Sequence, residues 1–170
     1  MKLNDLKRNL KETSREGLIK DILELYRKND FVKDFYASKY ADDDCPSILI
    51  KHKDLIENEF FPKRGDGKGR LSVAKKAISE FKKVSSNKEF IAELMIFYVE
   101  IGVRYTNEYG DIDEPFYCSM EGMYEKSLGY MKKNNLLELF GERAEKVVRD
   151  TSGMGWGFHD QLYEVYYQYY

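Results

Sequence analysis

The stretch Phe90-Ile-Ala-Glu-Leu-Met-Ile-Phe-Tyr-Val-Glu-Ile-Gly-Val-Arg-Tyr105 decides the fold, because apolar side chains cover almost its whole circumference at helical spacing. A helix of this kind is buried from most sides and lies at the centre of a molecule. The preceding Ser86-Asn-Lys-Glu89 has the form of a capping box, and Gly110 is a typical helix terminator. The sequence therefore predicts a long central helix between Ser86 and Gly110.

Five amphipathic helices are predicted before the central helix, from apolar residues three or four positions apart. The second helix begins at a capping box, Thr13-Ser-Arg-Glu16, and stops at Asn29. A loop at 42–46 precedes the fourth helix, over 47–60, which Pro62 ends. Ser72 is the predicted N-cap of the fifth helix.

Three more helices are predicted after the central one. Their limits are an acidic connector at Asp111-Ile-Asp-Glu-Pro115, a break at Asn134-Asn135, a helix over 136–149, a glycine turn at 151–157 and a last helix over 158–170. No segment shows the alternation of a β-strand. The prediction is an all-α fold, an irregular multi-helix bundle of antiparallel helical hairpins, with a short α-solenoid as the alternative. We expect residues 1–170 to form a single domain.

The composition is that of a folded protein, with 42% hydrophobic and 34% charged residues. The longest uninterrupted apolar run, Leu94 to Val99, is far too short to cross a bilayer, and residues 1–8 have no apolar signal-peptide core. We therefore expect a cytoplasmic protein with no membrane partner. In that compartment Cys45 and Cys118 are expected to be reduced thiols.

The net charge of −2 conceals an asymmetry between the two halves of the chain. Residues 1–85 carry 20 basic and 15 acidic side chains, whereas residues 86–170 carry 8 and 15. A basic half can attract an anionic partner. It can equally attract the acidic half within one fold, and the sequence leaves both readings open.

A glycine-rich basic loop, Gly65-Asp-Gly-Lys-Gly-Arg70, leads into an amphipathic helix with one basic face. Glycines allow backbone N–H groups to converge on an anion, and a helix N-terminus adds positive potential. The predicted anion-binding residues are Lys63, Arg64, Lys68, Arg70, Ser72, Lys75 and Lys76, with Lys82 and Lys83 continuing the basic face. The loop is not a Walker P-loop, because Lys68 is followed by glycine and a helix precedes it. The alternative interpretation is a solvated, mobile loop.

Histidines and cysteines do not form a convincing metal site. The order of His52 and His159-Asp160 resembles that of all-helical metal phosphohydrolases, but no aspartate follows residue 160 to complete their pattern. Cys45 and Cys118 lie too far from each other and from the histidines in sequence for the ligand pairs of structural zinc sites. The sequence predicts no metal and no cofactor.

Acidic residues offer a second candidate site. Glu93 and Glu100 are two turns apart on the central helix, so with Arg104 they are expected to form a core ion-pair network, including a Glu100–Arg104 pair. The alternative cleft would combine the acidic connector with the glycine turn, and its residues are Asp111, Asp113, Trp156, His159 and Asp160. Helix capping by Asp113 or Glu114 is the structural alternative.

Four stretches together resemble an uncharacterised bacterial family of unknown function. They are Phe60-Phe-Pro-Lys-Arg-Gly65, Leu71-Ser-Val-Ala-Lys-Lys-Ala-Ile-Ser-Glu-Phe-Lys82, Thr106-Asn-Glu-Tyr-Gly-Asp-Ile-Asp-Glu-Pro-Phe-Tyr117 and Asp150-Thr-Ser-Gly-Met-Gly-Trp-Gly-Phe-His-Asp-Gln-Leu162. This resemblance implies no activity, cofactor or catalytic residue. Separately, the leucine and isoleucine pattern of residues 6–22 resembles the SAP-like helix pairs of some DNA-binding proteins, with a shorter linker.

The sequence favours a binding or adaptor module over an enzyme. Its basic loop and helix would engage an anionic partner, either an acidic protein or a nucleic acid. One alternative is a metal-dependent hydrolase that uses the acidic connector and His159-Asp160. The other is a structural homo-oligomer that associates through the tyrosine-rich C-terminal helix.

Overall fold

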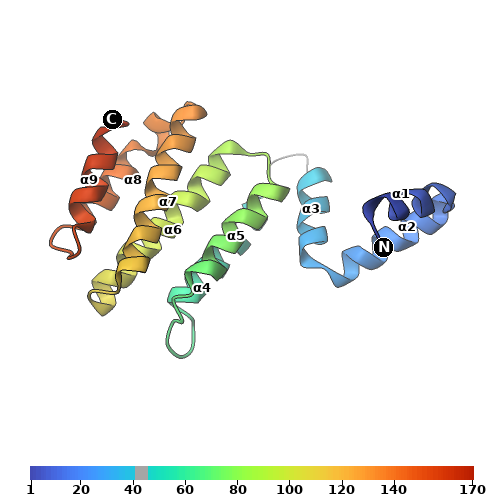
Figure 1. Cartoon of the computed structure of the whole chain (residues 1–170), viewed down its shortest axis with the longest axis horizontal. Coiled ribbons are helices and arrows are strands. Elements are labelled where there is room, and N and C mark those ends of the chain that lie inside the picture. Colours follow the sequence, from blue (N-terminus) through green and yellow to red (C-terminus); the bar gives the residue numbers. More distant parts are fainter. Residues whose placement is uncertain (41–45) are drawn as a thin grey trace.

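The computed structural model describes residues 1–40 and 46–170, and over these ranges the chain forms nine helices and no strand (Figure 1). The helices are α1 (Leu3–Glu12), α2 (Arg15–Lys28), α3 (Asp30–Tyr40), α4 (Pro46–Phe60), α5 (Leu71–Val84), α6 (Lys88–Tyr109), α7 (Glu114–Lys133), α8 (Leu137–Asp150) and α9 (Phe158–Tyr167). The all-α multi-helix prediction is confirmed. No described helix has the length and apolar character that a membrane span requires.

Helix α6 is the buried centre of the molecule, as its sequence predicts. Half of its 22 residues are buried, including Leu94, Ile96, Tyr98 and Val99 with no exposed surface. It packs against α4, α5, α7 and α8. At Gly102 an added Cβ atom would lie 2.3 Å from the sulfur atom of Met120 on α7. A glycine in α6 therefore allows α7 to approach its backbone.

Helices α4 to α9 form a body, and α1 to α3 form an arm that extends to one side of it (Figure 1). Every buried residue of the described chain belongs to the body, whereas no residue of α1, α2 or α3 is buried. The arm therefore contributes nothing to the hydrophobic core. Its amphipathic helices were predicted correctly, but their apolar faces remain exposed.

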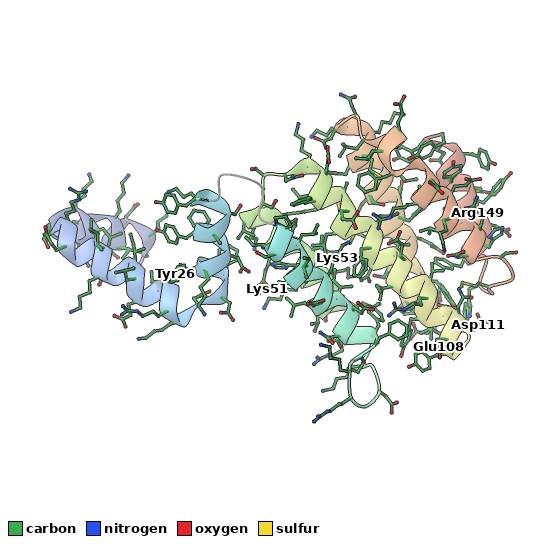
Figure 2. The ribbon with its side chains drawn as sticks, turned by 180° about the vertical axis from the view of Figure 1, so that it is seen from behind. Tyr26, Lys51, Lys53, Glu108, Asp111 and Arg149 are labelled. Carbon is green, nitrogen blue, oxygen red and sulfur yellow. The ribbon has the colours of Figure 1, made fainter. Side chains whose placement is uncertain are left out.

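The arm joins the body where α3 packs against α5. Both carboxylate oxygens of Asp34 on α3 accept hydrogen bonds of 2.9 Å from Lys51 of α4. Lys51 lies on the side of the body that faces the arm (Figure 2). Since the Asp34 side chain is only 14% exposed, this ion pair is better shielded from solvent than a surface pair.

His52 lies beneath this junction and is 3% exposed. Its Nδ1 atom is 3.0 Å from the carbonyl oxygen of Ala77, and a carbonyl only accepts, so Nδ1 carries the proton. The Nε2 atom has no hydrogen-bond partner and lies 3.5 Å from the Asp34 carboxylate. Burial lowers the pKa of His52, and this effect is larger than the opposite effect of the nearby Asp34 carboxylate, which raises the pKa. His52 is therefore a neutral ring, packed edge-on against Phe81.

Three predicted N-caps are displaced by one or two residues. Helix α2 is capped by Ser14 rather than Thr13, and its hydroxyl accepts from the N–H of Gly17. Asn87, rather than a Ser86 capping box, caps α6. Helix α5 begins directly after Arg70, so Ser72 is its second residue and not its N-cap. In each case a neighbouring residue already holds the extended conformation from which the helix starts.

Other predicted boundaries agree with the structure. Asn29 ends α2, and Gly110 ends α6 with a positive φ of 84°. The last helix stops at Tyr167, three residues earlier than predicted. Of the predicted loop at 42–46, only Pro46 is described, as the first residue of α4, and Cys45 lies outside the described residues. Cys118 is an exposed free cysteine.

Replacing His52 by Phe should reduce the pH dependence of stability while keeping an aromatic ring against Phe81. Above the ordinary histidine pKa of about 6.5, the ring is neutral in both the folded and the unfolded chain. As the pH falls below this value, the unfolded chain takes up the proton first, so the free energy of unfolding decreases. Urea denaturation at about pH 7.5 and about pH 5.5 should show a smaller loss for His52→Phe than for the wild type.

The matched control is His159→Gln, because His159 is the second of the two histidines in the chain. The loss of stability in His52→Phe is compared with the loss in this variant as well as with that in the wild type. An equal loss of stability in His52→Phe and wild type would show that the buried ring does not titrate in this way.

Candidate functional site

The basic loop, defined here as residues 61–70, is held at its end by an ion pair with the body. Arg70 donates to the Glu59 carboxylate from Nε at 2.7 Å, from Nη2 at 3.0 Å and from its backbone N–H at 3.1 Å. Glu59, at the end of α4, is 7% exposed, and the hydrogen bonds from Arg70 lower the pKa of its carboxyl. A bidentate pair of this geometry fixes direction as well as distance. The loop is therefore anchored where α5 begins.

A second restraint lies inside the basic loop, at Gly67. A Cβ atom at this position would be 1.8 Å from the carbonyl oxygen of Phe60, so no other residue fits this backbone path. The next glycine, Gly69, has a positive φ of 57° and donates its N–H to the carbonyl oxygen of Glu59 at 3.0 Å. The glycines thus fold the loop back onto the last turn of α4.

Aromatic packing on α6 fixes the beginning of the basic loop. The ring of Phe61 lies between the guanidinium of Arg104, 3.9 Å from the ring centroid, and the rings of Tyr105 and Tyr109. Arg104 is itself oriented by a 2.8 Å hydrogen bond to Glu57 on α4. The loop is therefore anchored at both ends, and Lys63, Arg64 and Lys68 between the anchors are exposed.

The predicted anion-binding residues differ in how far their charges are used within the fold. Arg70 is paired with Glu59, and Lys76 lies 3.6 Å from Glu80. The remaining four cations are exposed and form no salt bridge with a carboxylate of residues 1–40 or 46–170. These four are Lys63, Arg64, Lys68 and Lys75. The basic loop projects from the end of the body between α4 and α5 (Figure 1). Three of these four charges, on Lys63, Arg64 and Lys68, thus lie on a loop whose two ends are fixed.

The basic face of α5 ends in a packing contact. The ammonium of Lys82 lies 5.6 Å from the ring centroid of Tyr130 on α7, and burial lowers the pKa of Lys82. Lys82 and Lys83 are both exposed. Lys82 therefore contacts Tyr130 of α7 and still belongs to the exposed basic face of α5.

Among the alternative cleft residues, Asp111 contacts the glycine turn. Its Oδ1 atom accepts from the hydroxyl of Tyr117 at 3.0 Å and from the N–H of Gly155 at 3.4 Å. A Cβ atom at position 155 would lie 2.8 Å from Oδ2 of Asp111. Asp113 caps α7 by accepting from the N–H of Phe116 at 2.9 Å, as the capping alternative predicts. The acidic connector thus holds the turn and starts a helix.

The other alternative cleft residues have local roles or none. Nδ1 of His159 lies 3.0 Å from Oγ1 of Thr151 and 3.2 Å from the carbonyl oxygen of Val148, so this ring binds the end of α8. Trp156 is 61% exposed on a left-handed turn residue, and Asp160 is exposed in the first turn of α9. In the part of the chain that the structure describes, no three His, Cys, Asp or Glu side chains are grouped to hold a metal ion.

A charged groove of about 370 Å³ runs between α6 and α8 and was not predicted from the sequence. The core network that was predicted does form beside it, but with different partners. Arg143 of α8 donates to Glu93 and, at 2.7 and 2.9 Å, to Glu100. The predicted Glu100–Arg104 pair is wrong, because Arg104 turns to Glu57 across α4.

The groove has little free charge to offer a ligand. Of its lining side chains, Glu100 is paired with Arg143, and Arg104 is paired with Glu57. Beside the groove, Glu93 accepts from Arg143 and Lys53, and these two partners lower its pKa although burial raises it. Lys146 pairs with Asp150 within α8. The spacing of two carboxylates on a buried helix was the only sequence signal of this network, and its basic partner lies some 43 or 50 residues away in sequence.

The comparisons with known proteins agree with the resemblance noted from the sequence. No match was found among curated proteins or among solved structures. One family model, described as a family of unknown function (DUF6155), matches residues 1–170. The chain therefore belongs to the DUF6155 family.

Proposed function

We propose that this protein is a cytoplasmic adaptor that binds an acidic segment of a partner protein through its basic loop. The observation that carries the proposal is the combination of fixed ends and free charge in one segment. Lys63, Arg64 and Lys68 form no salt bridge within residues 1–40 and 46–170, while Glu59 and Phe61 anchor the loop that bears them.

Fixed ends favour binding because less conformational entropy is lost when the partner docks. A loop that was only solvated would need neither a nearly buried carboxylate nor a glycine against the Phe60 carbonyl. Lys75 and Lys76, on the first turns of α5, extend the positive surface beside the loop. The proposed binding surface is therefore residues 63–76 without Arg70, which is paired with Glu59.

The overall charge favours a protein partner over a nucleic acid. The chain has a net charge of −2, and its second half carries seven more acidic than basic residues. A nucleic acid presents phosphates over a long path and is usually bound by a domain with an extended basic surface. A short acidic peptide needs only the local charge of the basic loop.

The hydrolase alternative gains no support from the described residues. Asp113 and His159 are used in helix-end contacts, and Asp111 is used in the glycine turn. The adaptor proposal is supported by three cations on one anchored loop, Lys63, Arg64 and Lys68, that form no salt bridge within residues 1–40 and 46–170.

Reversing the three free charges should abolish binding to an acidic probe. We expect fluorescence anisotropy to show that labelled polyglutamate binds the wild type and that its affinity falls roughly tenfold or more between low and physiological salt. The variant Lys63→Glu/Arg64→Glu/Lys68→Glu should lose this binding, since attraction becomes repulsion.

The matched control reverses three exposed charges of the body outside the basic loop, in Lys88→Glu/Lys126→Glu/Lys133→Glu. This control has the same net charge as the test variant, and it should bind polyglutamate more tightly than the test variant does. Equal loss in both variants would mean that only net charge matters. A mixed-sequence DNA duplex is measured in parallel, and tighter binding to DNA than to polyglutamate would replace the protein partner by a nucleic acid.

The variant Glu59→Gln separates loop geometry from simple charge. It removes one negative charge and releases Arg70, so electrostatics alone predicts tighter binding of polyglutamate. If the anchored loop is the binding element, affinity should instead fall by roughly two- to tenfold, because the loop becomes mobile. Hydrogen exchange of the amides of residues 63–69 should accelerate in the same variant. An increase in affinity would contradict the role of the anchored loop.

A further inference from the structure

The arm carries two apolar hollows that no described part of the chain covers. One, of about 390 Å³, is lined by Ile19, Leu23, Tyr26 and Tyr40, and the other, of about 300 Å³, by Leu25, Phe31, Val32 and Phe35. Ile22 and Tyr36 line both hollows. These two residues therefore form a ridge with a hollow on either side, and we call the side chains of both hollows and the ridge the arm surface.

The arm surface is too large to be a normal feature of a monomer. Seven of its side chains are between 37% and 55% exposed, and Tyr40 is 71% exposed. At about 200 Å² for each large side chain when fully exposed, these fractions amount to roughly 800 Å². The largest apolar patch on a typical monomer is about 300–600 Å².

The helices of the arm also need a covering to be stable. They have 10, 14 and 11 residues, and none of these residues is buried. Helices of this length are marginal in water, and in proteins most of their stability comes from packing of an apolar face. An occupant that is present only occasionally would leave the arm without that packing for most of the time. The occupant should therefore be one that always accompanies the chain.

We propose that the arm surface is the interface of a homodimer, in which a second copy of this chain docks its own α2–α3 surface across a two-fold axis. The available area matches the roughly 800 Å² that each partner buries in an interface of standard size. A ridge between two hollows can be self-complementary, because each ridge can enter a hollow of the other copy.

The charges around the arm surface fit a second copy better than a strongly charged partner. Residues 1–40 carry ten basic and seven acidic side chains, and both signs occur on all three helices. Several are already paired within the arm, as in Lys28–Glu24 and Lys33–Asp30. Such a mixed rim neither repels its own copy strongly nor selects a partner of one sign.

The tyrosine-rich C-terminal helix is a poorer interface. The hydroxyl of Tyr170 donates to the carbonyl oxygen of Leu137 at 2.7 Å, and the ring of Tyr166 stacks on that of Tyr170. Tyr169 packs over Gly129 of α7, with its hydroxyl 3.2 Å from an added Cβ atom. Tyr166 and Tyr169 pack against the core and Tyr170 binds Leu137, which leaves Tyr163 and Tyr167 as the exposed tyrosines of α9. The arm is therefore the better site for self-association.

The test is the mass of the full-length protein in solution. Light scattering of the wild type at on the order of 100 μM should give twice the 20.1 kDa of the chain. Ile22→Glu places a charge on the ridge and should raise the dimer dissociation constant by at least roughly 30-fold, which gives a monomer at moderate concentration. The control Tyr163→Glu, on the exposed face of α9, should remain a dimer. A monomeric wild type, a dimeric Ile22→Glu, or a monomeric Tyr163→Glu would each overturn the proposal.

A second measurement needs no variant and is not affected by unfolding of the arm in Ile22→Glu. Hydrogen exchange of the wild type is followed at concentrations above and below the dimer dissociation constant. Amides of α2 and α3 should exchange faster on dilution, while those of α6 should not change. Exchange in α2 that does not depend on concentration would overturn the proposal.

Discussion

The burial of α6 is the constraint on which the rest of the body depends. A helix that is apolar on nearly all sides has to be surrounded, and α4, α5, α7 and α8 supply the layers around it. Two carboxylates interrupt its apolar surface, Glu93 and Glu100, and they are accommodated because Arg143 of α8 pairs with both and Lys53 of α4 pairs with Glu93. Gly102 completes the arrangement by allowing α7 to lie against the helix backbone. Burial of one helix thus determines both the positions of its neighbours and the need for a charged partner among them.

Hydrophobic periodicity predicted the helices well, because each helix has an apolar face whatever lies against it. It did not predict which of these faces would be covered. The patterns of α2 and α5 are of the same kind, yet Phe81 of α5 is 1% exposed and Ile19 of α2 is 49% exposed. The difference lies in tertiary contacts, which leave no local trace in the sequence. N-caps were misplaced by one or two residues for a related reason, since Ser14 and Asn87 have equally suitable neighbours.

The candidate site could be predicted only in its composition. The glycines and cations of the basic loop are visible in the sequence, but its anchors are not. Glu59 precedes Arg70 by eleven positions and belongs to another helix, so no spacing rule connects the two. The steric role of Gly67 depends equally on the carbonyl of Phe60, which a sequence pattern cannot place. Among the predicted cations, Arg70 is used in a salt bridge of the fold, whereas Lys68 forms no salt bridge within residues 1–40 and 46–170.

The arm has a consequence for how the basic loops would act together. It joins the body through α3, and the basic loop lies at the opposite end of α5 from the turn that follows Val84 (Figure 1). Two chains joined through their arms would present two basic loops on one scaffold. A partner with two acidic segments would then meet the second loop at a raised effective concentration, and its apparent affinity would exceed that of either loop alone. Weak, salt-sensitive contacts of a few lysines would in this way become selective for multivalent partners.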